Sequence, residues 1–179
     1  MTRTAKTYGG ALYDLAAEEG RAGRILQEMK VLCDAFAQEP EYVYLLATPS
    51  LSKEERCKIL DESFRGKIDG YLLNFMKILC ENGTIRQFSG CAQEFRRRYN
   101  EDNGILEVRA ITAIPMNDAL TQKLKDRLTA VTGKRIELSC QVDPACLGGV
   151  RLEMDGQQLD GTVQTRLDNI RRQLAQTVL

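Results

Sequence analysis

The chain has 179 residues, and its 25 basic and 25 acidic side chains give a formal net charge of zero. This balance removes the electrostatic reason to expect nucleic acid or anionic lipid as the main partner. Histidine is absent, which excludes catalytic triads and metal sites that need an imidazole. The sequence has no apolar run long enough to span a membrane and no apolar leader at its start, so we expect a cytosolic chain whose six cysteines are reduced.

Apolar side chains recur every three or four positions through the first hundred residues, which predicts a helical region. Turn residues divide this pattern into six segments. Ser52, with Glu55 three residues later, forms a capping box that starts the fourth helix, and Thr84 with Gln87 marks the start of the sixth in the same way. We therefore expect a six-helix bundle whose core includes Leu12, Leu15, Ile25, Met29, Leu60, Phe75, Leu79, Phe88 and Phe95.

The first predicted helix carries small residues on the side opposite its expected core face. Its core face carries Tyr8 and three further apolar residues, whereas Gly9, Gly10, Tyr13 and Ala17 lie on the other side. Small residues at these positions would let another helix approach closely. The two glycines also weaken the helix by roughly 1 kcal/mol each relative to alanine.

The fifth helix, predicted over 68–81, is apolar around most of its circumference. Tyr71 and Ile78 extend its core face on one flank, and Leu73 and Cys80 extend it on the other. Such a helix is either central in its bundle or offers an apolar surface to a partner, and both interpretations stay open at this point.

A polar stretch over residues 100–104 marks a domain boundary, because it holds turn residues and no apolar anchor. Beyond it the apolar residues alternate, then follow a helical period, then alternate again. This order predicts a strand, a helix, a strand, a hairpin and a final helix. We expect an α+β protein, with the six-helix bundle over 1–103 and a small mixed α/β domain over 104–179.

The end of the chain carries the most specific pattern. Gly148 and Gly149 precede an alternating strand, Asp155-Gly156 is a tight-turn dipeptide, and a second Asp-Gly follows at Asp160-Gly161. Asp160 is the predicted N-cap of the final helix, where its carboxylate would accept hydrogen bonds from unpaired backbone amides.

Three stretches of the sequence resemble the delta subunit of F-type ATP synthases, whose mitochondrial counterpart is the oligomycin-sensitivity-conferring protein. They are Tyr-Gly-Gly-Ala-Leu-Tyr-Asp-Leu-Ala at 8–16, Asn-Phe to Glu-Asn-Gly over 74–83 followed by Arg86, and Gly-Gly-Val-Arg-Leu over 148–152 with the two Asp-Gly turns behind it. Gly9 and Gly10 depart from the family, which often has alanine and a larger residue there.

The resemblance implies a non-catalytic stator subunit that joins the catalytic head of the synthase to its peripheral stalk. In this family the helical domain binds the amphipathic N-terminal helix of one alpha subunit with its first and fifth helices. The candidate contact residues are therefore Tyr8, Ala11, Tyr13, Tyr71, Leu73 and Ile78.

The resemblance also implies that the C-terminal domain holds the b subunits of the stalk. The residues expected to shape its corner are Gly148, Gly149, Asp160 and Gly161, with a backbone role for the glycines. No cofactor, metal or nucleic acid is expected. The chain would reach the membrane only through the complex, at the cytoplasmic face of the bacterial plasma membrane.

Two other classes of function remain as alternatives. The basic run Arg96 to Arg98, beside Phe95 and Tyr99, could contact phosphates in a nucleic-acid-binding helical protein. A thiol enzyme would need one cysteine with a lowered pKa. No two cysteines are separated by two residues, which excludes a redox Cys-x-x-Cys pair and a zinc ribbon.

Overall fold

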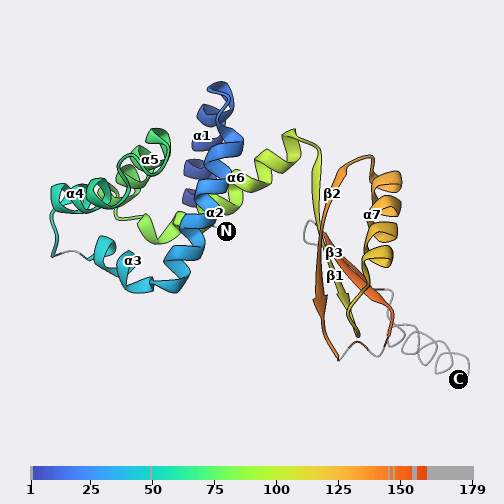
Figure 1. The fold of residues 1–179 in the computed structure, drawn as a ribbon. Coiled ribbons are helices and arrows are strands. Elements are labelled where there is room, and N and C mark those ends of the chain that lie inside the picture. Colours follow the sequence, from blue (N-terminus) through green and yellow to red (C-terminus); the bar gives the residue numbers. More distant parts are fainter. Residues whose placement is uncertain (1, 49, 145, 147, 155–156, 161–179) are drawn as a thin grey trace, which may run out of the picture. The chain divides into compact units, whose positions relative to one another are not determined.

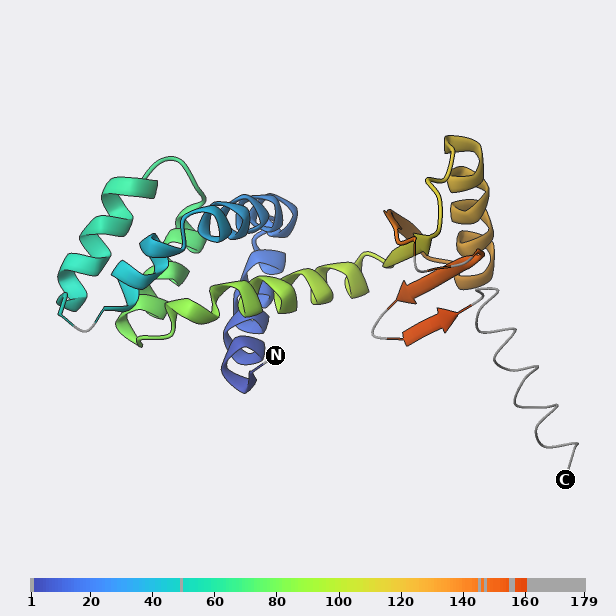
Figure 2. The same cartoon turned by 90° about the horizontal axis from the view of Figure 1, so that it is seen from below.

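The computed structural model describes residues 2–48, 50–144, 146, 148–154 and 157–160. The chain divides into two compact units, Met1–Asn100 and Glu101–Leu179. The polar stretch in the sequence predicts this boundary slightly later, after residue 103. The last helix of the first unit runs through the division. Figures 1 and 2 show the two units, each of which is described by itself below.

The first unit is helical, as the periodicity predicted. The elements are α1 (Arg3–Glu18), α2 (Ala22–Gln38), α3 (Pro40–Ala47), α4 (Lys53–Phe64), α5 (Gly70–Glu81), the short 3₁₀ helix η1 (Ile85–Gln87) and α6 (Phe88–Asp102). Among the described residues, none of these helices is both long enough and apolar enough to cross a membrane.

The two predicted N-terminal caps have different outcomes. The capping box at Ser52 is confirmed, because the Glu55 amide donates to Ser52 Oγ at 3.2 Å and the Ser52 amide donates to the Glu55 carboxylate at 2.8 Å. The cap at Thr84 is wrong. Its hydroxyl instead donates to the carbonyl of Leu79, and Gln87 ends the 3₁₀ turn that precedes α6.

The core of the first unit is deep and contains residues from every helix. The α5 side chains that point inward include Leu72, Met76 and Leu79, none of which has measurable exposure. Leu73 and Cys80 are also buried, so one of the two apolar flanks of α5 lies inside the bundle. Most of the apolar circumference of α5 is thus explained by its central position.

The second unit is a four-stranded sheet with one helix across it. Its elements are β1 (Ile105–Thr112), α7 (Asp118–Thr132), β2 (Arg135–Val142), β3 (Val150–Met154) and β4 (Gln157–Asp160), in the spatial order β2-β1-β3-β4. β1 and β2 are parallel, as their crossover through α7 requires, and the other two pairs are antiparallel. Figures 1 and 2 show α7 on one face of this sheet.

The core of the second unit lies between α7 and the sheet. Leu106, Val108 and Ile136 are buried there, and Leu128 of α7 packs against them. The side chains of β1 alternate as the sequence predicted, since Leu106 and Val108 are buried while Arg109 is exposed. The α+β fold class is confirmed: six helices are followed by a mixed sheet with one helix. The predicted final helix lies outside the described residues.

Candidate partner-binding surface

Helices α1 and α5 lie side by side and run in opposite directions. Near the start of α1, the Tyr8 hydroxyl accepts a hydrogen bond from Asn82 Nδ2, just after the end of α5, at 3.2 Å. Beyond the end of α1, the Arg21 guanidinium lies over the ring of Tyr71, near the start of α5, 5.5 Å from the ring centre. Ile78 is one helical turn before Asn82 and therefore shares the side of α5 that Tyr8 reaches.

Apolar side chains with solvent exposure line both helices along this side. On α1 they are Tyr8, Ala11 and Leu15, spaced by three and four residues, and on α5 they are Tyr71 and Ile78, two helical turns apart. Leu15 is 39% exposed and Ile78 is 44% exposed, while Ala11 is exposed and the two tyrosines are half-buried. We call these five residues the α1/α5 surface.

The candidate contact residues of the sequence analysis divide into two groups. Tyr8, Ala11, Tyr71 and Ile78 belong to the α1/α5 surface. The structure buries the other two candidates, Tyr13 at 5% exposure and Leu73 at 7%.

Packing inside the first unit explains the burial of Tyr13. Its ring meets that of Phe95 on α6 edge to face, with the ring centres 5.3 Å apart. Leu15 differs in the opposite sense, since the sequence pattern assigned it to the core and the structure leaves it partly exposed. A helical wheel groups residues by direction, but it does not say which directions point to neighbouring helices.

The small residues on the back of α1 admit another helix, and that helix is α6 of the same chain. A Cβ added at Gly9 would lie 2.5 Å from the carbonyl oxygen of Cys91, which is closer than van der Waals contact permits. A Cβ at Gly10 would meet the guanidinium of Arg98 at 2.6 Å. Across the same contact, Gly90 faces Ala5. The glycines therefore serve the packing of α1 on α6.

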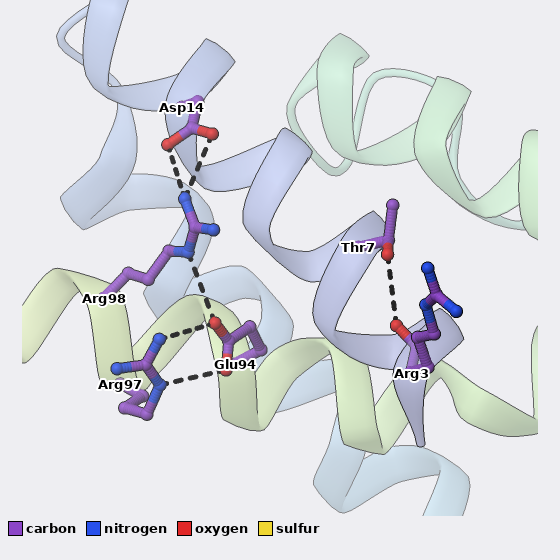
Figure 3. Close-up of polar contacts among 6 residues, drawn as sticks. All are labelled: Arg3, Thr7, Asp14, Glu94, Arg97 and Arg98. Atoms are coloured by element: carbon purple, nitrogen blue, oxygen red, sulfur yellow. Dashed lines mark hydrogen bonds and ion pairs between the residues drawn. The ribbon is translucent and has the colours of Figure 1, made fainter. Parts of the chain in front are cut away.

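Charged side chains reinforce the contact between α1 and α6. The Arg98 Nη1 donates to both carboxylate oxygens of Asp14 on α1, at 2.8 and 3.0 Å, and Arg98 Nε donates to Glu94 at 3.3 Å. Arg97 adds two hydrogen bonds to the same Glu94, at 2.7 and 3.0 Å. Figure 3 shows Arg98 between the two carboxylates.

This network of hydrogen bonds affects the pKa of Glu94, and it also involves the basic run that was considered for binding nucleic acid. The hydrogen bonds from Arg97 hold the pKa of the Glu94 carboxyl below its usual value, against the opposing effect of burial. Two of the three arginines proposed to contact phosphates, Arg97 and Arg98, are thus bound to carboxylates of this chain. These ion pairs support a structural role for the basic run Arg96 to Arg98.

Burial disfavours the thiolate form of the cysteines in the first unit. Burial raises the pKa of Cys80 and of Cys91 to about 11, and it also raises the pKa of Cys33 and of Cys57. Within the described part of the chain, no three carboxylate or thiol side chains gather where they could hold a metal ion.

The corner motif of the second unit is described only in part. Gly148 and Gly149 have φ angles of 150° and 91°, and both values lie in the positive range that residues other than glycine rarely adopt. Asp160 ends β4, where its backbone pairs with that of Arg151. Gly161 and the capping role predicted for Asp160 fall outside the described residues.

The first unit exposes an apolar surface across two of its helices, and such surfaces are typical of proteins that bind other proteins. The family model for the ATP synthase delta (OSCP) subunit matches residues 4–174. The chain belongs to this family, and its function is that of a non-catalytic stator subunit of the ATP synthase. The resemblance noted in the sequence is thereby confirmed.

Relatives and a solved structure agree with this assignment along the whole chain. The ATP synthase subunit delta of Alkaliphilus metalliredigens is 30% identical over 98% of this chain and 97% of its own length. That of Alkaliphilus oremlandii is 29% identical over 97% of each. A chain of the Toxoplasma gondii mitochondrial ATP synthase hexamer has the same fold, with a TM-score of 0.78 over 98% of both chains at 20% identity.

Proposed function

We propose that the chain joins two partners within the synthase, one through each unit. The first unit binds the N-terminal helix of one alpha subunit of the catalytic head at the α1/α5 surface. The second unit binds the b subunits of the peripheral stalk. Through these contacts the stator keeps the head from turning with the rotor, at the cytoplasmic face of the bacterial plasma membrane.

The observation that carries the first assignment is the pair of apolar rows on antiparallel helices. Leu15 and Ile78 are each exposed by about two fifths. The α1 row has the three-and-four-residue spacing of a helix face, and the two α5 residues are seven positions apart, which places them on one face as well. An amphipathic helix can cover such rows with its own apolar face, as in other complexes where a helix docks across two helices. A partner that covers them removes apolar area from water, which favours binding.

The second assignment is supported by apolar side chains exposed in the second unit. Leu120, near the start of α7, is 54% exposed, and Val142, at the end of β2, is 45% exposed. Val142 is the last residue of β2, and Leu120 lies in the first turn of α7, the element that follows β1 in the chain. A stalk helix that packs there would cover them.

Binding of a peptide that copies the alpha-subunit N-terminus tests the first assignment. Ala11→Glu and Ile78→Lys each place a charge in the apolar rows, and we expect each to weaken peptide binding at least tenfold in calorimetry, because the charge would be buried in the complex. Val31→Lys on α2 is the matched control, since Val31 is 67% exposed away from these rows. All three variants should keep the wild-type circular dichroism spectrum, and unchanged affinity in both surface variants would contradict the assignment.

A crossed experiment separates the two units. We expect Leu120→Lys to weaken binding of the full chain to the soluble part of the b subunits and to leave binding of the alpha peptide unchanged. Ile78→Lys should have the opposite pattern. If either variant weakened both interactions in a folded chain, the assignment of one partner to each unit would be wrong.

A further inference from the structure

Arg21 lies at one end of the α1/α5 surface, in the turn between α1 and α2. Its side chain is 50% exposed, and its guanidinium covers the ring of Tyr71 at 5.5 Å. On its other side, Nη1 donates to Oδ2 of Asp69 at 3.1 Å. The charge of Arg21 is therefore fixed beside the last aromatic residue of the surface.

Asp69 explains why the guanidinium keeps this position. Its carboxylate is 1% exposed, and its Oδ1 caps α5 by accepting from the Tyr71 amide at 2.9 Å. Its own amide donates to the Glu28 carboxylate at 2.7 Å. A buried carboxylate needs a charged partner, and Arg21 is that partner.

A guanidinium has five N–H donors, and the hydrogen bond to Asp69 uses only one of them. Among the residues that the structure describes, Arg21 makes no other side-chain hydrogen bond. Half of the side chain faces solvent, so the remaining donors are available to a molecule that covers the α1/α5 surface.

We propose that Arg21 binds a carboxylate on the helix that docks on the α1/α5 surface, and so contributes to the choice of partner. This inference rests on the proposed function of that surface. A guanidinium matches a carboxylate in shape and charge, and the ring of Tyr71 and the Asp69 carboxylate already hold it in place. Little side-chain entropy is lost when the partner arrives.

The charges around Arg21 define what it selects. Glu18 and Glu19 precede it and are exposed, so they repel acidic segments at a distance. Only a carboxylate positioned to accept directly from Arg21 gains from the contact. The partner helix should therefore carry one acidic residue at the end that lies beside Tyr71.

Double-mutant cycles between the full chain and the alpha-subunit peptide test this directly. We expect Arg21→Gln to weaken peptide binding about fivefold, as for other partly exposed ion pairs. Changing each peptide carboxylate in turn to its amide should identify one position that weakens binding by the same factor in the wild type and has no further effect in Arg21→Gln. Arg24→Gln is the matched control, since Arg24 is 66% exposed and pairs with Glu28, and it should bind like the wild type.

A second variant separates contact with the partner from support of Asp69. In Arg21→Gln/Asp69→Asn the buried charge is removed together with its partner, while the asparagine oxygen still caps α5. We expect this double variant to bind the peptide as weakly as Arg21→Gln. Recovery of wild-type affinity would show that Arg21 acts only through Asp69, and would overturn the proposal.

The remaining outcomes also distinguish this inference from the function on which it rests. If the wild type binds the peptide, Ile78→Lys weakens binding at least tenfold and no peptide carboxylate couples to Arg21, then the proposed function stands and the role of Arg21 is refuted. If the wild type does not bind the peptide at all, both fail.

Discussion

Helix α1 has one face that is buried against α6 and another that is partly exposed beside α5. Toward α6 it is closed: Gly9 and Gly10 bring the backbones together, and Tyr13 packs on a core ring. Toward α5 it is open along one edge, where Ala11 and Leu15 remain exposed. Apolar and small residues thus have two roles on one helix. On the closed face they pack α1 into the bundle, and on the open face they remain available to a partner.

The largest difference between the faces should appear when a tyrosine is removed from each. Tyr13→Ala should lower the free energy of unfolding by about 3–5 kcal/mol, because it leaves a cavity against Phe95. Tyr8→Ala should cost about 1 kcal/mol, because Tyr8 is only half-buried. Urea denaturation measures both values, and a larger loss for Tyr8 than for Tyr13 would reverse the assignment of the two faces.

The next effect concerns the glycines of the closed face. Gly9→Ala should lower the free energy of unfolding by about 1–3 kcal/mol, because the new methyl group has no room beside the Cys91 carbonyl. Gly70→Ala is the control: nothing lies within 4 Å of its added Cβ, so stability should stay the same or rise by up to about 1 kcal/mol. Equal stabilisation in the two variants would mean that α1 and α6 do not approach as closely as described.

A smaller effect, which depends on pH, should come from the buried carboxylate of the closed face. The pKa of Glu94 is lowered in the folded state, so its ionised form contributes stability above its unfolded pKa, and this contribution is lost as the pH falls through the folded pKa. Glu94→Gln should therefore cost about 1–2 kcal/mol at pH 7 and progressively less below about pH 4. Thermal denaturation across this range measures the difference, and a cost that grew on acidification would contradict the role given to Arg97.

The sequence predicted the helices and the sheet well, because both depend on local patterns. The capping box at Ser52 and the alternation along β1 required no knowledge of distant residues. Which residues belong to the α1/α5 surface was harder to predict, because Tyr13 and Ile78 both lie outside the expected core face of their helices. Only the position of a neighbouring helix decides that Tyr13 is buried and Ile78 is exposed.

The sequence patterns also could not predict which residues far apart in the chain would be in contact. The glycines at 9 and 10 signalled a close helix contact correctly, but not that α6 makes it. Arg98 was grouped with its neighbours as a basic run, although its partner Asp14 lies 84 residues earlier in the chain. The place of Arg21 at the end of the surface depends in the same way on Asp69, 48 residues later. Such pairs become visible only when the helices are packed.

The most direct test of the open face is an NMR titration of the full chain with the alpha-subunit peptide. We expect the largest chemical-shift changes along α1 and α5, at Tyr8, Ala11, Leu15, Tyr71 and Ile78, with little change at Tyr13 and Leu73, because these two side chains are already buried. Shifts confined to residues 104–160, or no shifts at saturating peptide, would contradict the central claim that the open edge of α1 and α5 is where the catalytic head is held.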